Sequence, residues 1–470
     1  MLEFHKKKSK NPSKTEPEKR IKDFQEIYSQ FDKNDSVEQS SRCSQCGIPY
    51  CQIHCPLYNN IPDWLRYIAE GRLEEAYQVS ASTNAFPEVC GRVCPQDRLC
   101  EGNCVVEQAG FGAITIGNLE KYLTEIAWEK GWVKNLSSQN QNKQKVAIIG
   151  SGPAGMAASA YLIQNGYKVD VYEKNDRAGG LMIYGIPNFK LDKKIVERRT
   201  EWLTDSGVVF NLNTEVGKNI SFQDLEKDYD AILIATGVYK ARQLDIDTST
   251  VNNSIPALDF LIESNRTGLG DSPSKNKYLT AKDKHVVVIG GGDTAMDCVR
   301  TAIRQQAKEV TCLYRRNKEN MPGSAREVLN AEQEGIKFNW LSVPSKIISD
   351  SATATSMTYK VATLGEVDES GRRKPIDTGV EKQIKSDLII QALGFEPEDL
   401  NHNFKTNIEL TSWKTVKVDF KKFQTSNPKI FAAGDIVRGA SLVVWAIHDG
   451  REVAKSIHNF LQSSKIKKAS

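Results

Sequence analysis

Ten cysteines are the residues whose spacing most clearly indicates chemistry, because eight of them lie in the first quarter of this 470-residue chain. The first group has two, four and three residues between successive cysteines and ends in the pair Cys55-Pro56. Thiolates are soft ligands that suit iron–sulfur clusters, zinc or copper(I). The two groups comprise Cys43, Cys46, Cys51 and Cys55, followed by Cys90, Cys94, Cys100 and Cys104.

Three interpretations of these cysteines are open. A close run of cysteines that ends in Cys-Pro is typical of bacterial ferredoxins, in which the last cysteine of a run often serves the other cluster. We therefore predict two [4Fe–4S] clusters with crossed ligation. Two structural zinc sites would also take eight ligands, but usually as paired C-x2-C knuckles, and only Cys43 and Cys46 have that spacing. Unligated structural thiols are the third alternative.

A glycine-rich turn follows a short apolar run at 146–149 and fits the pattern G-x-G-x-x-G. In this pattern the first glycine permits a tight turn, the second admits a pyrophosphate, and the third lets helix and strand pack closely. Glu173 ends a second predicted strand and would accept hydrogen bonds from an adenosine ribose. We predict a dinucleotide site rather than an incidental turn. Its residues here are Gly150, Gly152, Pro153, Ala154, Gly155 and Glu173, with Gly180 and Leu181 after them.

The same pattern returns after a predicted strand at 286–289, now as G-x-G-x-x-A. The next predicted strand, 310–314, ends on two arginines instead of an acid. An acid would favour the free 2′-hydroxyl of NAD, whereas guanidinium groups favour the 2′-phosphate of NADP. A solvated arginine pair is the alternative. The predicted NADPH site comprises Gly290, Gly292, Asp293, Thr294, Ala295, Arg315 and Arg316.

Two later turns of small residues return the chain to the first nucleotide site. One ends a predicted buried strand at Gly237, and the other is Gly434-Asp435. In flavoproteins with two dinucleotide domains, the second pattern places its aspartate against the flavin ribityl chain. We therefore predict FAD at the first site, and a helix over 443–460 that covers the flavin.

The predicted fold class is α/β, with two Rossmann-like dinucleotide-binding domains, the second inserted in the first, preceded by an α-helical iron–sulfur domain. Apolar residues from Ile21 to Phe31 fall on one face of a predicted helix. The polar segment 135–144 is a predicted linker. The predicted divisions are a disordered tail at 1–20, the helical domain at 21–143, the FAD domain at 144–280 and 395–470, and the NADPH domain at 281–394, with a disordered end at 463–470.

Composition narrows the class of protein. Hydrophobic residues make up 39% and charged residues 26%, as in globular proteins. No apolar run approaches 18 residues, so we expect no membrane partner. The amino-terminal residues lack the apolar core of a signal peptide, so we expect a cytoplasmic protein. A net charge of +4 is too small to indicate nucleic acid binding.

The sequence resembles the small (beta) subunits of NADPH-dependent glutamate synthase, from about residue 20 to about residue 462. The amino-terminal part of dihydropyrimidine dehydrogenase and the large subunit of NADH-dependent ferredoxin:NADP oxidoreductase are similar too. The motifs that carry the resemblance are the two cysteine groups, Thr83-Asn84, Gly179 to Pro187, Tyr314-Arg315-Arg316, Met321-Pro322-Gly323 and Ala433-Gly434-Asp435.

The resemblance implies a ligand set for each cluster. One cluster would take Cys43, Cys46, Cys51 and Cys104. The other would take Cys55, Cys94, Cys100 and a non-cysteine side chain, which corresponds to Glu120. Cys90 would then be a bystander, although spacing alone favours it, so the eighth ligand stays open between these two residues.

The resemblance also implies a function. The chain would be the electron-input subunit of a hetero-oligomer, passing electrons from NADPH through FAD and both clusters to the flavin of a large (alpha) subunit that makes glutamate from glutamine and 2-oxoglutarate. One alternative is an NAD(P)H oxidoreductase of the same build that serves ferredoxin or another acceptor. A zinc-stabilised interaction module fused to a flavoprotein is the other. Hydride transfer needs juxtaposed rings rather than a general acid, so we predict no acid–base residue.

Overall fold

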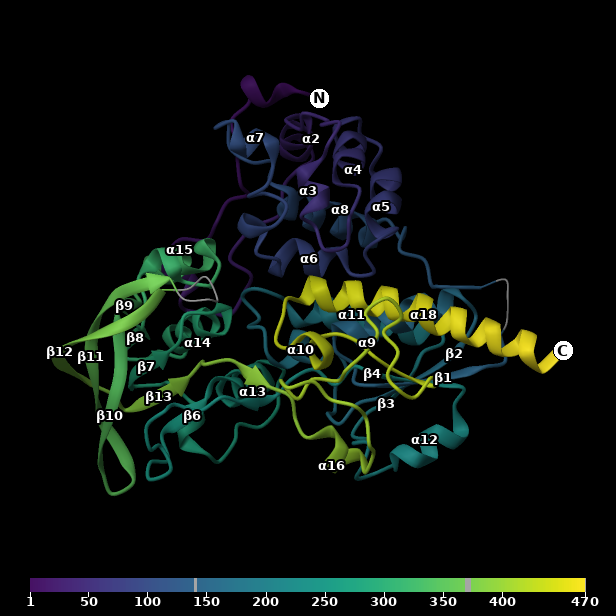
Figure 1. Ribbon diagram of the computed structural model, residues 1–470. Helices are drawn as coiled ribbons and strands as arrows, with labels where there is room; N and C mark the ends of the chain where they lie inside the picture. Colours follow the sequence, from purple (N-terminus) through teal and green to yellow (C-terminus); the bar gives the residue numbers. More distant parts are fainter. Residues whose placement is uncertain (139–141, 368–372, 470) are drawn as a thin grey trace.

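The computed structural model describes residues 1–138, 142–367 and 373–469 (Figure 1). A helical amino-terminal lobe sits above two α/β lobes that lie side by side. This arrangement confirms the predicted fold class. Residues 139–141 of the predicted linker lie outside the described residues.

Apolar residues at helical spacing build the amino-terminal lobe. Ile61, Trp64, Leu65 and Ile68 lie on one face of α4, and all four are buried. The α-helices are α1 (Pro17–Arg20), α2 (Lys33–Ser41), α3 (Tyr50–Ile53), α4 (Ile61–Ala69), α5 (Leu73–Ala81), α6 (Pro87–Val93), α7 (Val105–Gln108) and α8 (Ile116–Glu129). Two 3-10 turns, η1 (Glu3–His5) and η2 (Gln96–Arg98), complete the lobe.

The amino-terminal segment corrects two predictions. Residues 1–20 are not a disordered tail, because Arg20 is buried and its Nε donates to Oε1 of Glu334 at 2.8 Å. The predicted helix after Ile21 is absent from the described residues, since α1 ends at Arg20. Instead, residues 13–15 pair with residues 27–29 through backbone hydrogen bonds. These long-range contacts override the helical periodicity.

The first α/β lobe contains a parallel sheet in the order β15-β4-β1-β2-β3. Its last strand in the sequence lies at the edge of the sheet, beside β4, so the second nucleotide domain is inserted in the first, as predicted. The strands are β1 (Lys145–Ile149), β2 (Lys168–Tyr172), β3 (Val209–Asn211), β4 (Ala231–Ile234) and β15 (Ile430–Ala432). The helices are α9 (Pro153–Gln164), α10 (Leu181–Tyr184), α11 (Lys193–Asp205), α12 (Phe222–Asp228), α16 (Leu400–Phe404), α17 (Asp435–Arg438) and α18 (Val443–Ala469).

The long helix α18 packs along α9 and reaches the underside of the amino-terminal lobe (Figure 1). It continues to Ala469, through most of the segment predicted to be disordered, and Ser470 lies outside the described residues. None of the helices in the described part of the chain combines the length and apolar character that a membrane span requires.

The second α/β lobe contains a parallel sheet in the order β6-β13-β7-β8-β9 and a three-stranded antiparallel sheet, β10-β11-β12. The strands are β6 (Ser254–Pro256), β7 (His285–Ile289), β8 (Glu309–Tyr314), β9 (Lys337–Trp340), β10 (Ser342–Asp350), β11 (Thr353–Val367), β12 (Arg373–Lys385) and β13 (Leu388–Gln391). The helices are α13 (Ala257–Gly268), η3 (Lys277–Leu279), α14 (Asp293–Arg304), η4 (Lys318–Asn320) and α15 (Ala325–Gln333).

The boundary between the two α/β lobes differs from the predicted one at residue 280. β6 pairs with β13 and therefore belongs to the second sheet. Residues 264–284, a polar stretch that contains Gly and Pro, follow β6 and therefore lie within the second lobe. The chain instead crosses between the lobes at two short strands, β5 (Lys240–Ala241) and β14 (Phe395–Glu396), which pair antiparallel.

Candidate functional site

The first predicted dinucleotide site lies at the carboxyl ends of the strands of the first lobe. There a cavity of about 1120 Å³, its open mouth included, is lined by the glycine-rich turn and by the ends of β1, β2 and β4. The cavity extends from Glu173 after β2 to Asp435 at the start of α17. The predicted residues that line it are Gly150, Gly152, Pro153, Ala154, Glu173, Leu181, Gly237 and Asp435.

The predicted glycines of this site shape the wall of the cavity. Gly150 has φ +104°, and a Cβ there would lie 2.5 Å from the carbonyl oxygen of Ala235. A Cβ at Gly155 would lie 2.1 Å from the carbonyl oxygen of Gly150. A Cβ at Gly180 would lie 2.7 Å from Cα of Gly152, and a Cβ at Gly434 would lie 2.9 Å from Cβ of Ala154. At Gly152 the space is open, which leaves room for a ligand to approach the start of α9.

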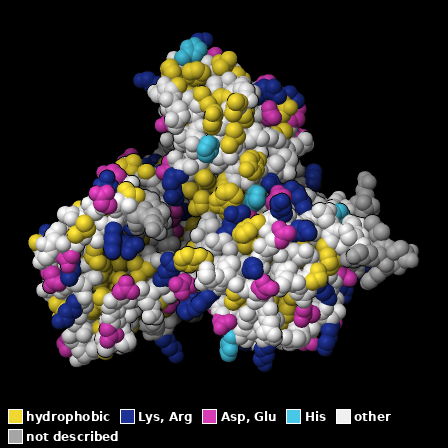
Figure 2. Space-filling model, in the orientation of Figure 1, with side chains coloured by type: hydrophobic (Ala, Val, Ile, Leu, Met, Phe, Trp, Pro, Cys, Tyr) yellow, Lys and Arg dark blue, Asp and Glu magenta, His cyan; other side chains and the backbone are white. Residues whose placement is uncertain are grey.

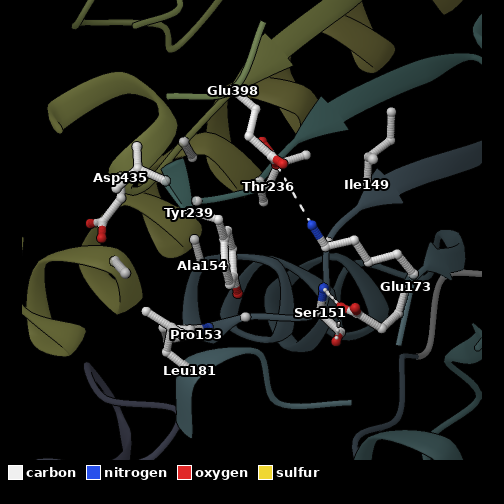
Figure 3. A pocket seen from close by; sticks show the side chains of 18 of the residues that line it. Ile149, Ser151, Pro153, Ala154, Glu173, Leu181, Thr236, Tyr239, Glu398 and Asp435 are labelled. Carbon is white, nitrogen blue, oxygen red and sulfur yellow. Dashed lines mark hydrogen bonds and ion pairs between the residues drawn. The ribbon is translucent and has the colours of Figure 1, made fainter. Parts of the chain in front are cut away.

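Two acidic residues line the cavity and lie on opposite sides of it (Figure 3). Glu173 follows β2, and its Oε2 accepts hydrogen bonds from the backbone N and the Oγ of Ser151 at 3.1 and 2.6 Å. Its Oε1 accepts from Asn175. Asp435 begins α17 and accepts from Oγ of Ser441 at 2.6 Å, while burial raises the pKa of its carboxyl group.

Sequence reasoning missed three residues of the cavity. Tyr239 lies two residues after Gly237 and extends across the cavity toward Pro153 (Figure 3). Burial, and then the nearby charge of Glu173, raise the pKa of this tyrosine. Lys174 Nζ lies 4.8 Å from the ring centroid of Tyr239 and 3.6 Å from Oε2 of Glu398. The tyrosine follows a recognised turn, but no sequence motif contains Glu398.

The second glycine-rich turn joins β7 to α14 in the second lobe. A Cβ at Gly290 would lie 2.2 Å from the carbonyl oxygen of Ala392, so the turn requires glycine there. Asp293 is the first residue of α14, and its Oδ1 accepts from the backbone N of Ser324 at 2.9 Å. The backbone N of Gly323 donates to the carbonyl oxygen of Gly291 at 2.9 Å. The residues predicted for NADPH from Gly290 to Ala295 thus form one turn, braced by a second loop.

The two arginines after β8 are not equivalent. Arg315 is exposed, whereas Arg316 is buried and its Nε donates to the backbone carbonyl of Arg373 on β12 at 2.7 Å. Arg315 is therefore the more accessible of the two to a 2′-phosphate.

Half of the predicted cluster ligands surround one cavity in the amino-terminal lobe. Its volume is about 430 Å³, and Cys55, Cys94, Cys100, Glu120 and also Cys90 line it. The Oε1 of Glu120 accepts from Nδ2 of Asn84 at 3.3 Å and from Oγ of Ser80 at 3.5 Å. Burial raises the pKa of Glu120 to about 8 and that of Cys55 to about 11. Both candidates for the eighth ligand therefore reach this cavity.

The other four predicted ligands come from loops and short helices. Cys43 follows α2, Cys51 lies on α3, and Cys104 precedes α7. Burial, and then the neighbouring Cys104 and Cys43, raise the pKa of Cys51 to about 12, because these thiols lie close together. Ser44 Oγ lies 2.9 Å from Sγ of Cys46, and Nε2 of Gln45 donates to Sγ of Cys43 at 3.3 Å. These four grouped thiols, of which Cys43 and Cys104 are buried, have polar neighbours and fit a cluster.

A site for a single metal ion needs a different arrangement of side chains from a cluster site. Across the described ranges, no group of three or more His, Cys, Asp or Glu side chains has the arrangement of a site for one metal ion. All ten cysteines are free thiols, and Cys298 and Cys312 are buried in the second lobe, away from the cluster cysteines.

The surface of the amino-terminal lobe carries exposed apolar residues. Figure 2 shows hydrophobic side chains gathered on this lobe. Ile48, Tyr50 and Ile53 lie between the predicted ligands Cys46 and Cys55, and 62%, 47% and 48% of their surfaces are exposed.

Two family models match the chain. Residues 20–132 match dihydropyrimidine dehydrogenase domain II, 4Fe-4S cluster. Residues 144–450, more than half of the chain, match pyridine nucleotide-disulphide oxidoreductase.

Several relatives are similar over nearly the full length of this chain. The glutamate synthase [NADPH] small chain of Azospirillum brasilense is 51% identical, over 98% of this chain and 97% of its own length. The glutamate synthase [NADPH] small chain of Escherichia coli K12 is 46% identical, over 94% of each. The putative oxidoreductase AegA of the same bacterium is 40% identical, over 97% of this chain and 71% of its own length.

Solved structures share the fold of the two α/β lobes. FprA from Mycobacterium tuberculosis has a TM-score of 0.59 at 19% identity, and the match covers 70% of this chain and 86% of that one. The thioredoxin reductase of Lactococcus lactis has a TM-score of 0.50 at 22% identity, with 68% and 100% covered. At these identities the likeness shows the fold alone.

Proposed function

We propose, from the premise that this chain belongs to the family of glutamate synthase small chains, that it carries electrons from NADPH through FAD and two [4Fe–4S] clusters to the flavin of a large (alpha) subunit. That subunit would use them to make glutamate from glutamine and 2-oxoglutarate. The chain is an NADPH-dependent oxidoreductase, with a 4Fe–4S domain ahead of a pyridine-nucleotide oxidoreductase fold.

One observation carries this proposal: consecutive residues of α18 line the two cavities. Val443 lines the large cavity of the first α/β lobe, and Val444 lines the cluster cavity. The same helix is fastened to the amino-terminal lobe, since Nη1 of Arg451 donates to the carbonyl oxygens of Leu57 and Thr83 at 3.1 and 2.9 Å. A single helical wall therefore separates the proposed flavin from the proposed cluster, which suits direct electron transfer.

The residues of the first lobe have distinct proposed roles. Gly150, Gly152 and the start of α9 would hold the pyrophosphate of FAD, Glu173 its adenosine ribose, and Asp435 its ribityl chain. FAD supplies the conversion of a two-electron hydride into single electrons when it is bound.

The second lobe would present NADPH to that flavin. The turn from Gly290 to Ala295 would hold its pyrophosphate, and Arg315 and Arg316 its 2′-phosphate. The cysteines would carry the clusters, with Cys43, Cys46, Cys51 and Cys104 nearest the apolar residues Ile48 and Ile53, where the large subunit would dock. The similarity to AegA favours one second candidate, an enzyme of the same build with a different acceptor.

The test uses the chain after anaerobic iron and sulfide reconstitution, with and without a glutamate synthase large subunit. We expect NADPH to bleach the flavin absorbance, to produce the electron paramagnetic resonance signals of reduced clusters, and to support glutamate formation only with the large subunit. A Cys55→Ser variant should keep flavin bleaching and lose glutamate formation. The matched control is Cys298→Ser, a buried cysteine outside both cysteine groups. Cluster reduction without glutamate would favour another acceptor, and absence of flavin and iron would contradict the proposal.

A further inference from the structure

The amino-terminal lobe touches the second nucleotide turn through two neighbouring residues. Asp97 and Arg98 lie in η2, between the predicted cluster ligands Cys94 and Cys100. Both are exposed, and both reach across to the second α/β lobe. The sequence offers no motif for this contact, because the partners are about 200 residues away.

Arg98 neutralises a charge in the proposed NADPH cradle. Its Nη2 lies 3.3 Å from Oδ2 of Asp293, and its Nη1 donates to the carbonyl oxygen of Pro322 at 2.6 Å. Asp293 is the first residue of α14, where a helix amino terminus would attract the NADPH pyrophosphate. A free carboxylate there would repel the diphosphate, so its pairing with Arg98 removes an unfavourable charge.

Asp97 fixes the loop that braces the same turn. Its Oδ1 accepts from Oγ of Ser324 and its Oδ2 from the backbone N of Ala325, both at 3.1 Å, at the start of α15. The backbone N of Ser324 in turn donates to Oδ1 of Asp293. Polar contacts therefore link Asp97 to Ser324, Ser324 to Asp293, and Asp293 to Arg98. Because Asp97 and Arg98 are consecutive in the chain, these contacts join the cluster lobe to the nucleotide turn at two points.

We propose that Asp97 and Arg98 are positioning residues for NADPH, supplied by the iron–sulfur lobe to the nucleotide-binding turn of another lobe. This inference rests on the proposed function, because that proposal assigns NADPH to residues 290–295. It implies that the affinity for NADPH depends on the segment between the predicted cluster ligands Cys94 and Cys100. The iron–sulfur lobe, which would accept the electrons, would then also help to bind NADPH, which donates them.

The experiment measures the dissociation constant of NADP⁺ on the reconstituted holoenzyme, by the perturbation of flavin absorbance. We expect Arg98→Ala to weaken NADP⁺ binding about tenfold, within the range usual for coupled sites. It should raise KM for NADPH and leave kcat with ferricyanide near the wild-type value. Arg98→Lys should recover part of the affinity. The matched control is Arg72→Ala, another exposed arginine of this lobe, which pairs with Glu70 and Glu75 instead.

A double variant tests the electrostatic argument. In an Asp293→Asn background the repelling charge is gone, so adding Arg98→Ala should cost less than half of its single-variant effect. Asp97→Asn provides an independent arm should Arg98→Ala lose flavin or iron, and it should also weaken NADP⁺. Wild-type affinity in whichever of these two variants keeps its flavin and iron would overturn the proposal.

A separate variant tests whether the NADPH site itself is assigned correctly. Arg315→Ala, measured in parallel, should weaken NADPH far more than NADH. If it does so while the Asp97 and Arg98 variants bind normally, only the positioning role is wrong. If Arg315→Ala affects both nucleotides equally, the assigned phosphate site is wrong as well.

Discussion

At the scale of single residues, the proposed second cluster depends on whether Glu120 or Cys90 is its fourth ligand. Within the described residues, its hydrogen-bond donors Asn84 and Ser80 both act on Oε1, which leaves Oε2 for iron. Cys90 lies in the same cavity, where its hydrogen bond, together with burial, holds the pKa of Cys94 well above its usual range. We predict that Glu120→Ala lowers the iron and acid-labile sulfide content toward one cluster per chain.

The companion variant is Cys90→Ala, which should keep both clusters if that cysteine is a bystander. Iron and sulfide analysis of the two reconstituted proteins distinguishes them. An unchanged content in Glu120→Ala, with loss in Cys90→Ala, would reverse the assignment.

At the scale of elements, α15 anchors the amino-terminal segment through a buried ionic cluster. Glu334 follows α15 and contacts Arg20, Arg300 and Arg304. Burial opposes its ionisation, but hydrogen bonds from Arg300 and Arg304 lower its pKa to about 2. Because the pKa is depressed in the folded state, its contribution to stability is present above about pH 4.5 and is lost as the pH falls toward 2.

We therefore predict that Glu334→Gln destabilises the protein at pH 7, by about 3–5 kcal/mol, since it leaves buried guanidinium groups without their partner. The difference from wild type should shrink as the pH falls from about 4.5 toward 2. Urea unfolding across this pH range measures it. Glu409→Gln is the control, because its pair with Lys417 is exposed and contributes little. A difference that stays constant over this range would contradict the argument.

Elements with local signals could be predicted from sequence, and elements held by distant contacts could not. Gly150 and Gly290 stand in turns whose geometry only glycine satisfies, so their motifs predicted both turns correctly. The segment after Ile21 has helical periodicity, yet it pairs with residues 13–15. Glu398 reaches Lys174 from a distant part of the sequence, and Arg98 reaches Asp293 in another lobe, so nothing in their neighbouring sequence marks them.

At the scale of the whole molecule, the amino-terminal lobe is the proposed exit for electrons. Ile48 and Ile53 are exposed and lie within the first group of cysteines, on the lobe that carries neither proposed nucleotide site. We predict that a double change of both residues to Asp lowers NADPH-dependent glutamate formation with the large subunit at least tenfold, because charges are unfavourable in the core of an interface. NADPH oxidation by ferricyanide and iron content should not change.

The control for this prediction is Trp413→Ala, since Trp413 is 78% exposed and belongs to the first α/β lobe. Loss of glutamate formation in the control, or none in the double variant, would place the docking surface elsewhere.

The antiparallel pairing of β5 with β14 has a consequence for how this architecture can be taken apart. The chain leaves the first α/β lobe and returns to it through adjacent strands, so the ends of the inserted portion meet. Neither parallel sheet borrows a strand from the other. A short splice joining the two crossing points would thus leave the remaining sheet whole, and the excised piece could close on itself. The second α/β lobe, which holds the proposed NADPH site, could therefore be exchanged for another nucleotide-binding lobe without changing the fold of the other two lobes.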